Sequence, residues 1–477
     1  MLDGGILTGH RAPAAPAPAY TVGRADAADR AAYDGLRRAE FVEVQRLFAG
    51  HDRDEADDDP RTVVLVARDV RGQVIGGVRV HPAPHPAVRA AGSRDLGWWR
   101  GSRLVVAPGA RGARAPVAAA LVRAACATAE DVGALRFDAA VQARHAALFT
   151  RLGWASRGAP TTRHGVAHVE MDWPVARVQR LVDATKAPLA GLLGRLAEHP
   201  LGGGGAGWVG DDAAPVPGAP LVAACDAILP SMVERDPEWA GWCAVLVNLN
   251  DLAAMGATPV GLLDAVGARD ASFARRVLRG LLDAAAAWGV PVLGGHTQLG
   301  VPAALSVTAL GATSRPVPGG GGRPGHALRL TADLGGAWRP GYTGTQWDST
   351  TSRSPAELRA TGEVVARLAP AAAKDVSMAG TVGTTGMLAE ASGCRAVLDV
   401  AAVPAPDGVP AGDWLTCFPG FAVVTADTPG APTTPLPDTV TSRVCGDLVE
   451  GAGVGLRWPD GVVTEAVGPA VTGLGAA

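Results

Sequence analysis

The sequence of 477 residues has few cysteines, and they are widely spaced. None of the six stands in the two-residue spacing that is typical of zinc and redox motifs. In a chain of this length, scattered cysteines indicate buried free thiols of a reducing compartment and not a disulfide framework. No apolar run reaches the length of a membrane span, and the N-terminus lacks the basic and apolar regions of a secretory signal. We therefore expect a cytoplasmic protein with no membrane partner.

The chain also has no large excess of positive or negative residues, since its formal net charge is −3. Without a basic field we expect no nucleic-acid partner. Lysine is nearly absent, since Lys186 and Lys374 are the only lysines among 43 basic residues, and aromatic residues make up only 5% of the chain. Hydrophobic residues nevertheless account for 48%, which is enough for full cores, and the length predicts two to four domains.

The first third of the chain begins with an Ala/Pro-rich stretch, residues 1–19, which predicts a disordered lead. The acidic run 51–60 favours a solvated loop over a metal site, because its acids are adjacent and do not converge on one point. After it, the apolar patterns and turn residues predict alternating strands and helices. These elements are expected at 61–82 (hairpin), 97–107 (strand), 116–130 (helix), 135–141 (strand), 145–152 (helix) and 168–173 (strand).

Two stretches of this region carry a family resemblance. They are RLVVAPGARGARAPVAAALVRAA (103–125) and FDAAVQARHAALFTRLGW (137–154). Together with the order of elements over residues 20–175, they resemble the GNAT acetyltransferases. The resemblance implies that backbone N–H groups at a helix N-terminus hold the pyrophosphate of acetyl-CoA. The residues implied in acetyl-CoA binding are Val106, Arg111, Gly112, Ala113 and Arg114.

The loop departs from the Arg/Gln-x-x-Gly-x-Gly/Ala pattern of that family. Arg114 and Pro116 stand at its two small positions. Arg114 either pairs with a phosphate directly or blocks the close approach that a glycine permits. For the base that would accept a proton from the substrate amine, Glu40, Asp95 and Asp138 are equal candidates, and each has an equally good structural interpretation.

The central stretch of the chain is 248–267, NLNDLAAMGATPVGLLDAVG. It begins on an amphipathic helix that starts near Trp239 and ends at Gly256. Asn248 and Asp251 lie on the side opposite its apolar face, and a buried strand is expected at 260–266. An amide and a carboxylate three residues apart on a helix beside a buried strand suit a Mg²⁺ or nucleotide site. A solvated polar face is the alternative.

Other polar residues stand near glycine turns and strand ends. Asp211 and Asp212 follow a glycine turn, where paired acids serve either an exposed turn or a Mg²⁺ site. Asp226 ends a predicted buried strand. Gly294 and Gly295 form a turn between strands that would expose N–H groups as an anion nest. The adjacent His296 has a structural alternative as a hydrogen-bonded histidine.

The running order of these motifs resembles the AIR synthase superfamily. GDDAA (210–214), a strand ending at Asp226, NLNDLAAMGATP (248–259), GGHT (294–297) and a strand ending at Gly311 follow one another in that order. A Gly/Pro-rich linker (316–325) precedes a second half with Lys374-Asp375-Val376-Ser377 before its main helix. The resemblance covers about residues 185–470. The whole chain resembles a fusion of a GNAT-like domain with an AIR synthase-related protein of the nitrilase-associated, nitrogen-starvation cluster type.

The resemblance implies ATP and Mg²⁺ as cofactors, with roles for named residues. Mg²⁺ would be held by Asp211, Asp212, Asp226 and Asp251. The nucleotide would contact Gly210, Asn248, Gly294, Gly295 and Thr297. Catalytic roles would fall to Lys374, Asp375, Ser377 and His296, while Asp348 and Ser349 would shape the acceptor pocket. The chain departs from thiamine-monophosphate kinase at Ser377-Met378-Ala379-Gly380, where that enzyme has Ser-Asp-Gly-Leu, so one acid is missing.

The expected fold class is α/β and α+β, with a GNAT fold followed by a two-part AIR synthase-like fold. The expected ranges are 1–19 (lead), 20–175 (GNAT-like), 176–205 (helical connector), 206–315 (ATP-binding), 316–325 (linker) and 326–472 (C-terminal domain). The expected function is a bifunctional enzyme of nitrogen metabolism. One half transfers phosphoryl groups or activates a carbonyl or amide, and the other acetylates an amine. The alternatives are an acetyltransferase regulated by a nucleotide-sensing half, and a non-catalytic scaffold. A homodimer through the ATP-binding domain and a small-molecule substrate, an amine or amide, are implied.

Overall fold

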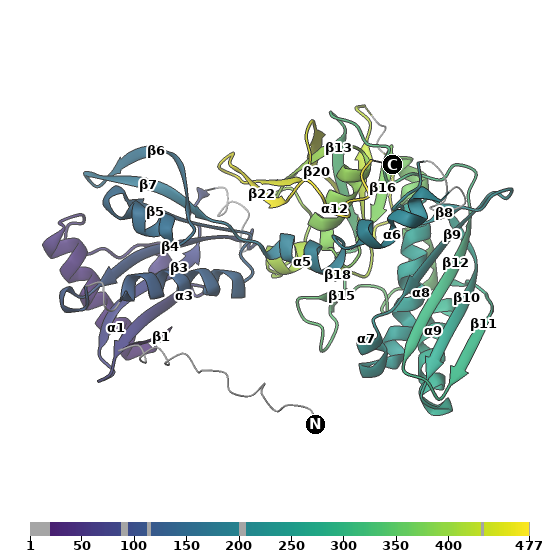
Figure 1. Cartoon of the computed structure of the whole chain (residues 1–477), viewed down its shortest axis with the longest axis horizontal. Helices are drawn as coiled ribbons and strands as arrows, with labels where there is room; N and C mark the ends of the chain where they lie inside the picture. The colour runs from purple at the N-terminus through teal and green to yellow at the C-terminus, as the bar shows by residue number, and fades with distance from the viewer. Residues whose placement is uncertain (1–19, 87–93, 112–115, 200–206, 431–433, 477) are drawn as a thin grey trace, which may run out of the picture. The chain divides into compact units, whose positions relative to one another are not determined.

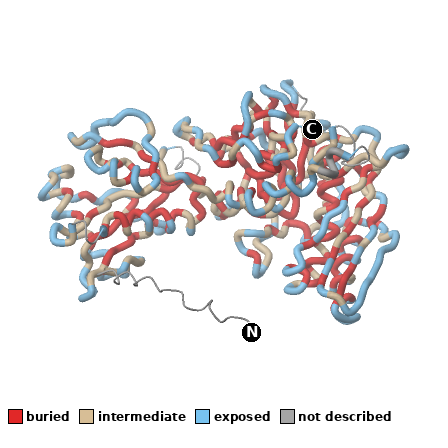
Figure 2. Tube along the Cα trace, viewed as in Figure 1, coloured by how far each residue is buried: buried red, intermediate tan, exposed pale blue. Residues whose placement is uncertain are grey.

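The computed structural model describes residues 20–86, 94–111, 116–199, 207–430 and 434–476. The chain divides into two compact units, which are described separately below (Figure 1). The smaller comprises residues 1–83 with 98–174, and the larger comprises 84–97 with 175–477. Buried residues form a core within each unit (Figure 2). The predicted lead 1–19 and the candidate residues Gly112, Ala113 and Arg114 lie outside the described residues.

The smaller unit is a mixed sheet with helices on both faces. Its strands run in the order β1-β2-β3-β4-β5-β7-β6, and β4 and β5 pair in parallel. A Cβ at Gly76 would meet Leu121 of α3, and one at Gly77 would meet Tyr33 of α1. Since successive strand residues point to opposite faces, α3 and α1 cover opposite faces of the sheet. The bounds are β1 Tyr20–Arg24, α1 Ala27–Arg37, β2 Val63–Asp69, β3 Val74–Pro82, β4 Trp98–Val106, α3 Val117–Asp131, β5 Arg136–Gln142, α4 Ala146–Arg151, β6 Ala155–Arg163 and β7 Val166–Trp173.

The predicted hairpin, strands and helices of this unit are confirmed, but β1, α1, the π-helical segment Arg38–Val44 and β6 were not predicted. A signal for α1 was present, because Asp26 and Asp29 form a capping box at its start. β6 gave no such signal. Almost all its residues are exposed, so it lacks the apolar alternation by which strands are recognised.

The acidic run 51–60 is a mostly exposed loop, as predicted, but the side chains of Asp52 and Asp57 are buried. Asp52 accepts a hydrogen bond from Arg37 Nε at 2.8 Å, and Asp57 accepts one from Arg37 Nη1 at 2.7 Å. Asp54 pairs with Arg79 Nη1 at 2.7 Å. Both arginine side chains are almost fully buried, and a buried charge needs a partner. The acidic run therefore neutralises buried guanidinium groups and is fixed to the sheet.

The first half of the larger unit is a sheet with helices on one face. The strand order is β11-β10-β12-β9-β8, and the inward residues of β9, β10 and β12 share one core with α8 and α9. The predicted cap of α9 is confirmed, since Asp270 accepts a hydrogen bond from the Phe273 N–H at 2.8 Å. The bounds are α5 Arg177–Thr185, α6 Leu189–Glu198, β8 Ala214–Pro215, β9 Leu221–Ala227, α7 Pro230–Arg235, α8 Pro237–Ala254, β10 Thr258–Ala268, α9 Ala271–Trp288, β11 Val292–Leu299 and β12 Ala304–Ala312.

The helix α8 is buried on all sides, which rules out the alternative of a solvated polar face for Asn248 and Asp251. Asn248, Asp251 and Met255 are buried as deeply as the apolar residues of its other face. The reason is that α8 packs on one side against the sheet and α9, and also contacts β16, α10 and α11 of the second half. Its polar side chains therefore lie inside the larger unit.

The second half of the larger unit contains a mixed sheet in the order β16-β19-β13-β20-β17-β21-β22 and a small sheet β14-β15-β18. The predicted helix before Gly393 is confirmed as α12, with Leu388 fully buried. The bounds are β13 Ala327–Ala332, β14 Ala337–Trp338, β15 Gln346–Asp348, α10 Pro355–Gly362, α11 Val364–Leu368, β16 Ala372–Asp375, α12 Gly380–Ala391, β17 Arg395–Asp399, α13 Ala411–Thr416, β18 Phe418–Pro419, β19 Ala422–Asp427, β20 Thr441–Val449, β21 Val454–Arg457 and β22 Val463–Val467.

The Gly/Pro-rich segment 316–325 is packed against both halves of the larger unit. The Val317 N–H donates to the Met255 carbonyl at 3.1 Å, and the Gly322 N–H donates to Ser392 Oγ at 3.0 Å. This segment therefore helps to fix the two halves against each other. Among the described residues, no helix combines the length and the apolar character needed to cross a membrane.

Candidate metal and phosphate site

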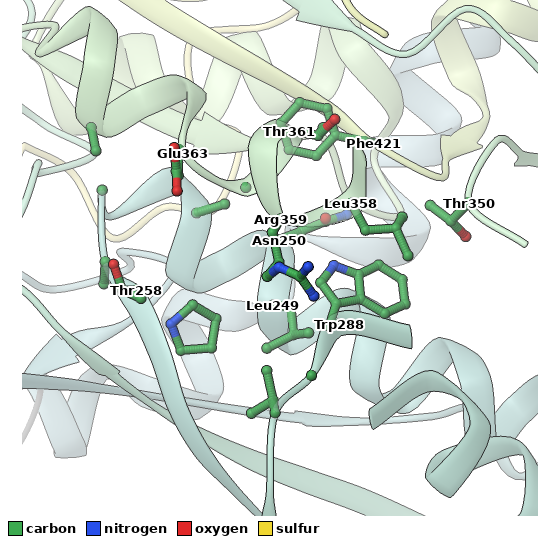
Figure 3. Close-up of a pocket in the computed structure, with 18 of the residues that line it drawn as sticks. Leu249, Asn250, Thr258, Trp288, Thr350, Leu358, Arg359, Thr361, Glu363 and Phe421 are labelled. Atoms are coloured by element: carbon green, nitrogen blue, oxygen red, sulfur yellow. The ribbon is translucent and has the colours of Figure 1, made fainter. Parts of the chain in front are cut away.

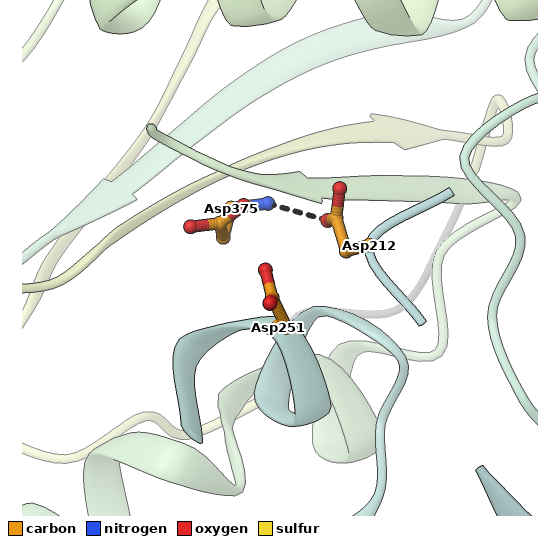
Figure 4. Close-up of side chains that lie close together, drawn as sticks. All are labelled: Asp212, Asp251 and Asp375. Carbon is orange, nitrogen blue, oxygen red and sulfur yellow. Dashed lines mark hydrogen bonds between the residues drawn. The ribbon is translucent and has the colours of Figure 1, made fainter. Parts of the chain in front are cut away.

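Three carboxylates from separate segments meet between the two halves of the larger unit (Figure 4). Asp212 stands in the turn before β8, Asp251 lies near the end of α8, and Asp375 ends β16. One oxygen from each carboxylate lies within 4.8 Å of the other two. We call these three residues the carboxylate cluster. These oxygen–oxygen distances are short enough for one cation to contact all three side chains.

Asp212 is held by two bonds from β16. Its Oδ1 lies 3.1 Å from Lys374 Nζ, and its Oδ2 accepts a hydrogen bond from the Asp375 N–H at 2.9 Å. Lys374 Nζ also donates to the Gly210 carbonyl at 2.7 Å. The glycine turn before Asp212 and the strand β16 are therefore joined by the buried ammonium group of Lys374.

Asp211 lies beside the cluster, and half of its carboxylate is unsatisfied. Its Oδ2 accepts a hydrogen bond from the Gly319 N–H at 3.0 Å. Its Oδ1 is buried, has no hydrogen-bond partner in the structure, and lies 4.0 Å from Lys374 Nζ. Burial raises the pKa of Asp211 to about 6, against the lowering effect of Lys374. An orphaned buried carboxylate oxygen is a place where a cation or an ordered water would bind.

The carboxylate cluster carries unbalanced negative charge. Burial raises the pKa of Asp251 well above its ordinary value, and the charge of Asp375 raises it further. Burial likewise raises the pKa of Asp375, followed by the charge of Asp212. Carboxylate oxygens are the ligands that Mg²⁺ prefers, and a divalent cation would remove the repulsion. The residues therefore fit a Mg²⁺ ion.

Both lysines of the chain interact electrostatically with carboxylates at this site. Lys374 is buried, yet Asp212 and Asp211 outweigh the effect of burial and raise its pKa. The positive charge of Lys186, at the end of α5, lowers the pKa values of Asp226 and Asp375, although desolvation raises both overall. Lys186 was not among the residues predicted for the site. Its signal was the rarity of lysine in a chain that otherwise uses arginine.

Asn248 lies one turn before Asp251 and is fully buried. Its Nδ2 donates to the Ala244 carbonyl at 2.8 Å, while its Oδ1 is buried without a partner in the structure. On a helix, residues three apart share a face, so the free oxygen of Asn248 lies on the side of α8 that carries Asp251.

The predicted turn at Gly294, Gly295, His296 and Thr297 is wrong. These residues lie within the exposed edge strand β11, which pairs in parallel with β10 from Val292 to Leu299. Their backbone therefore forms no anion nest. Packing explains the glycine at position 295 instead, because a Cβ there would lie 2.4 Å from Asp264 Oδ2. None of the four belongs to the carboxylate cluster.

Three further candidates of the second half, Ser377, Asp348 and Ser349, lie outside the carboxylate cluster. The Ser377 N–H donates to Thr384 Oγ1 of α12 at 3.4 Å. Asp348 Oδ1 accepts hydrogen bonds from the backbone of Thr350 and Thr351. Ser349 is fully buried.

In the smaller unit, Arg111 Nε donates to the Val106 carbonyl at 2.8 Å, and its guanidinium forms an ion pair with Glu40. Asp138 is fully buried and accepts hydrogen bonds from Trp98 Nε1 and Arg100 Nε. The buried ion pair and hydrogen bonds of Asp138 are those of a structural group. Asp95, which belongs to the larger unit, accepts a hydrogen bond from the Gly97 N–H.

The comparisons with known proteins concern the larger unit. Residues 210–313 match the family model "AIR synthase related protein, N-terminal domain". A protein of Synechocystis sp. that is described as uncharacterized is 35% identical over 229 residues, which is 46% of this chain and 70% of that protein. The chain belongs to the AIR synthase-related family. No family evidence supports a GNAT domain, so the smaller unit is a sheet domain of unidentified fold.

Other family relatives carry an enzyme name. A thiamine-monophosphate kinase of Rhodopirellula baltica is 36% identical over 138 residues, which is 27% of this chain and 44% of that enzyme. The chain thus spans less than half the length of this kinase. The solved structure "AaThiL complexed with AMPPCP and TMP" is 20% identical, covers 59% of this chain and 95% of that chain, and has a TM-score of 0.46. At that identity and TM-score, the likeness says nothing about ligands.

Proposed function

We propose that the larger unit transfers the γ-phosphoryl group of ATP, with Mg²⁺, to a small-molecule acceptor. The observation that carries the proposal is the carboxylate cluster of Asp212, Asp251 and Asp375, joined to Lys374. Phosphoryl transfer requires mostly positioning and neutralisation of phosphate charge. Family relatives that are named thiamine-monophosphate kinases support this reaction class.

The cluster would hold Mg²⁺, which would neutralise the phosphate charges when bound. The sequence predicted a role for Asp375 at the substrate, and we propose instead that Asp375 binds the metal. Lys374 is fully engaged by Asp212 and the Gly210 carbonyl, so its part is to position the metal-binding turn. No hydrogen bond or ion pair joins the side chain of Lys186 to the part of the chain that the structure describes, and the residue is half-buried. We assign to this side chain the contact with a phosphoryl oxygen.

The acceptor is proposed as an amine, amide or carbonyl compound whose oxygen or nitrogen takes the phosphoryl group. Met378, which is exposed, replaces an acid of the thiamine-monophosphate kinases, so the acceptor is expected to differ from theirs. The experiment is to incubate the full chain with Mg²⁺-ATP and fractionated metabolites, and to measure ADP and phosphorylated products by mass spectrometry.

In that experiment Asp212→Asn should lower ADP formation at least 100-fold, because it removes one cluster ligand. Asp283→Asn, an exposed carboxylate on α9, is the matched control and should leave the rate unchanged. Equal rates in Asp212→Asn and the wild type would overturn the proposal.

We also propose that the larger unit forms a homodimer through the uncovered face of its β11-β10-β12-β9-β8 sheet. Val260 and Leu263 of β10 are exposed, as are Leu293 and Leu299 of β11. An apolar sheet face open to water is typical of a protein interface. A second copy of the same sheet is the partner that its own shape and polarity suit.

For the smaller unit, acetyl-CoA-dependent acetylation of an amine is a second candidate function. What favours it is the strand and helix order from β2 to β7, which follows the order that the GNAT resemblance implies. Titration of acetyl-CoA into the full chain by calorimetry tests it. Binding that persists in Asp212→Asn supports this activity, and absence of binding contradicts it.

A further inference from the structure

A cavity of about 160 Å³ lies beside α8 (Figure 3). Leu249, Asn250 and Ala253 of α8 line it. Residues on a helix are separated by about 100°, so these three face away from Asn248 and Asp251. The three carboxylates of the cluster are absent from its lining, all of which belongs to described residues. The cavity is therefore a separate site.

Most of the cavity wall is apolar. The volume is close to that of an engineered protein cavity that holds one benzene molecule, so the apolar part accommodates a single ring or a branched chain of similar size. The apolar wall consists of Leu249, Pro259, Trp288, Val290, Leu358 and Phe421.

The charged groups of the lining leave one positive charge without a partner. Glu363 is paired with Arg367 at 2.5 Å, and Asp333 is paired with Arg353 at 2.7 Å. The side chain of Arg359, on α10, has no hydrogen bond or ion pair to any residue that the structure describes, and the residue is an exposed part of the lining. An anion is therefore the charge that this lining favours.

The guanidinium of Arg359 lies close to the C-terminal end of α9. Its Nη1 would lie 3.4 Å from a Cβ at Gly289, the residue that ends α9. The negative end of a helix dipole favours a cation there. Figure 3 shows the guanidinium of Arg359 beside the Trp288 indole and Asn250. Asn250 Nδ2 donates to the Gly420 carbonyl at 3.1 Å, which leaves its Oδ1 as a possible acceptor.

We infer that this cavity binds a small monocarboxylate with a flat apolar body. The body packs against Trp288 and Leu358, and the carboxylate is held at the mouth by Arg359. A guanidinium presents two parallel N–H groups to a carboxylate, which gives a strong and oriented contact. The size of the cavity limits the body to about one ring. Because the site is separate from the carboxylate cluster, its ligand does not compete with Mg²⁺-ATP.

Calorimetric titration of the full chain with three probes tests this inference. Benzoate has both the ring and the charge, benzyl alcohol has the ring alone, and acetate has the charge alone. Benzoate should bind at least tenfold more tightly than either of the other two. Equal affinity for benzoate and acetate, or no binding of benzoate, would overturn the inference.

Two variants locate the site. Arg359→Gln should weaken benzoate binding at least tenfold and leave benzyl alcohol unchanged, whereas Arg275→Gln, an exposed arginine of α9 outside the lining, should change neither. Ala366→Leu, at an exposed lining position, should narrow the cavity and weaken both ring probes. Wild-type affinity for benzoate in Arg359→Gln or in Ala366→Leu would contradict the assignment. These readouts need no ATP, so they are independent of the proposed phosphoryl transfer.

Discussion

Lys374 Nζ lies 3.1 Å from Asp212 Oδ1, although 162 residues separate the two in the chain. The same ammonium group donates to the Gly210 carbonyl. Lys374 thus joins the glycine turn of the first half to strand β16 of the second half. Since Lys374 is only 1% exposed, removing its charge would leave Asp211 and Asp212 buried without compensation.

Lys374→Met should lower the free energy of unfolding of the larger unit by about 3–5 kcal/mol, which is the usual cost of breaking a buried ion pair from one side. Lys186→Met is the matched control, because Lys186 is half-buried and has no ion pair to the described residues. It should lower stability much less than Lys374→Met does, and it should weaken Mg²⁺-ATP binding. Urea unfolding followed by circular dichroism measures the first effect. Equal stability of the two variants would contradict the structural role of Lys374.

Gly319→Ala should weaken Mg²⁺-ATP binding at least tenfold. A Cβ at this position would lie 2.4 Å from Asp211 Oδ1 and 2.9 Å from Lys374 Cε, so both side chains would have to move. Gly191→Ala is the control, since a Cβ at this helical glycine meets nothing within 4 Å and alanine favours a helix. Calorimetry on both variants gives the comparison. Unchanged affinity in Gly319→Ala would show that the approach of this segment to Asp211 does not matter for the site.

Asp212, Asp251 and Asp375 could be predicted as site residues from the sequence, because each of them stands in a short sequence motif. Their meeting depends on how two halves of the larger unit pack, which no local pattern reports. Packing also explains why a solvated face of α8 stayed open as an alternative, since the second half that covers this helix is distant in sequence. The glycines at 294 and 295 suggested a turn, but their backbone lies in a strand because its partner β10 continues beside them.

His81 should make the stability of the smaller unit depend on pH. The ring is 2% exposed, and its nitrogens lie 2.8 Å from the Pro82 carbonyl and 2.9 Å from Ser102 Oγ. Burial, followed by the charge of Arg79, lowers the pKa of His81 to about 4. Of the other nearby charges, Arg100 also lowers this pKa and Asp54 raises it.

In the unfolded chain the pKa of His81 is about 6.5, so the unfolded state takes up its proton first as the pH falls. The stabilisation is therefore complete above about pH 6.5 and is lost progressively down to about pH 4, by about 3 kcal/mol in all. Urea unfolding of the wild type and of His81→Gln between pH 4 and 8 measures the difference. A difference that does not change with pH would contradict a neutral buried His81.

Leu263→Glu should convert the proposed homodimer into a monomer. Leu263 lies on the uncovered face of the sheet and is 41% exposed in the single chain. A charge there would be buried without a partner in the dimer. Sedimentation equilibrium of the wild type and of Leu282→Glu, an exposed position on α9, provides the comparison. A wild-type chain that sediments as a monomer would refute the dimer.

The most direct test of the account is calorimetric titration of ATP into the full chain with and without Mg²⁺, in the wild type and in Asp251→Asn. Asp283→Asn is the control for the loss of one carboxylate. The wild type and Asp283→Asn should bind ATP only when Mg²⁺ is present, and Asp251→Asn should bind it at least 100-fold more weakly while folding at least as stably, because a repelled buried charge has been removed. Binding of ATP by Asp251→Asn with the wild-type affinity, or binding by the wild type that does not need Mg²⁺, would contradict the account.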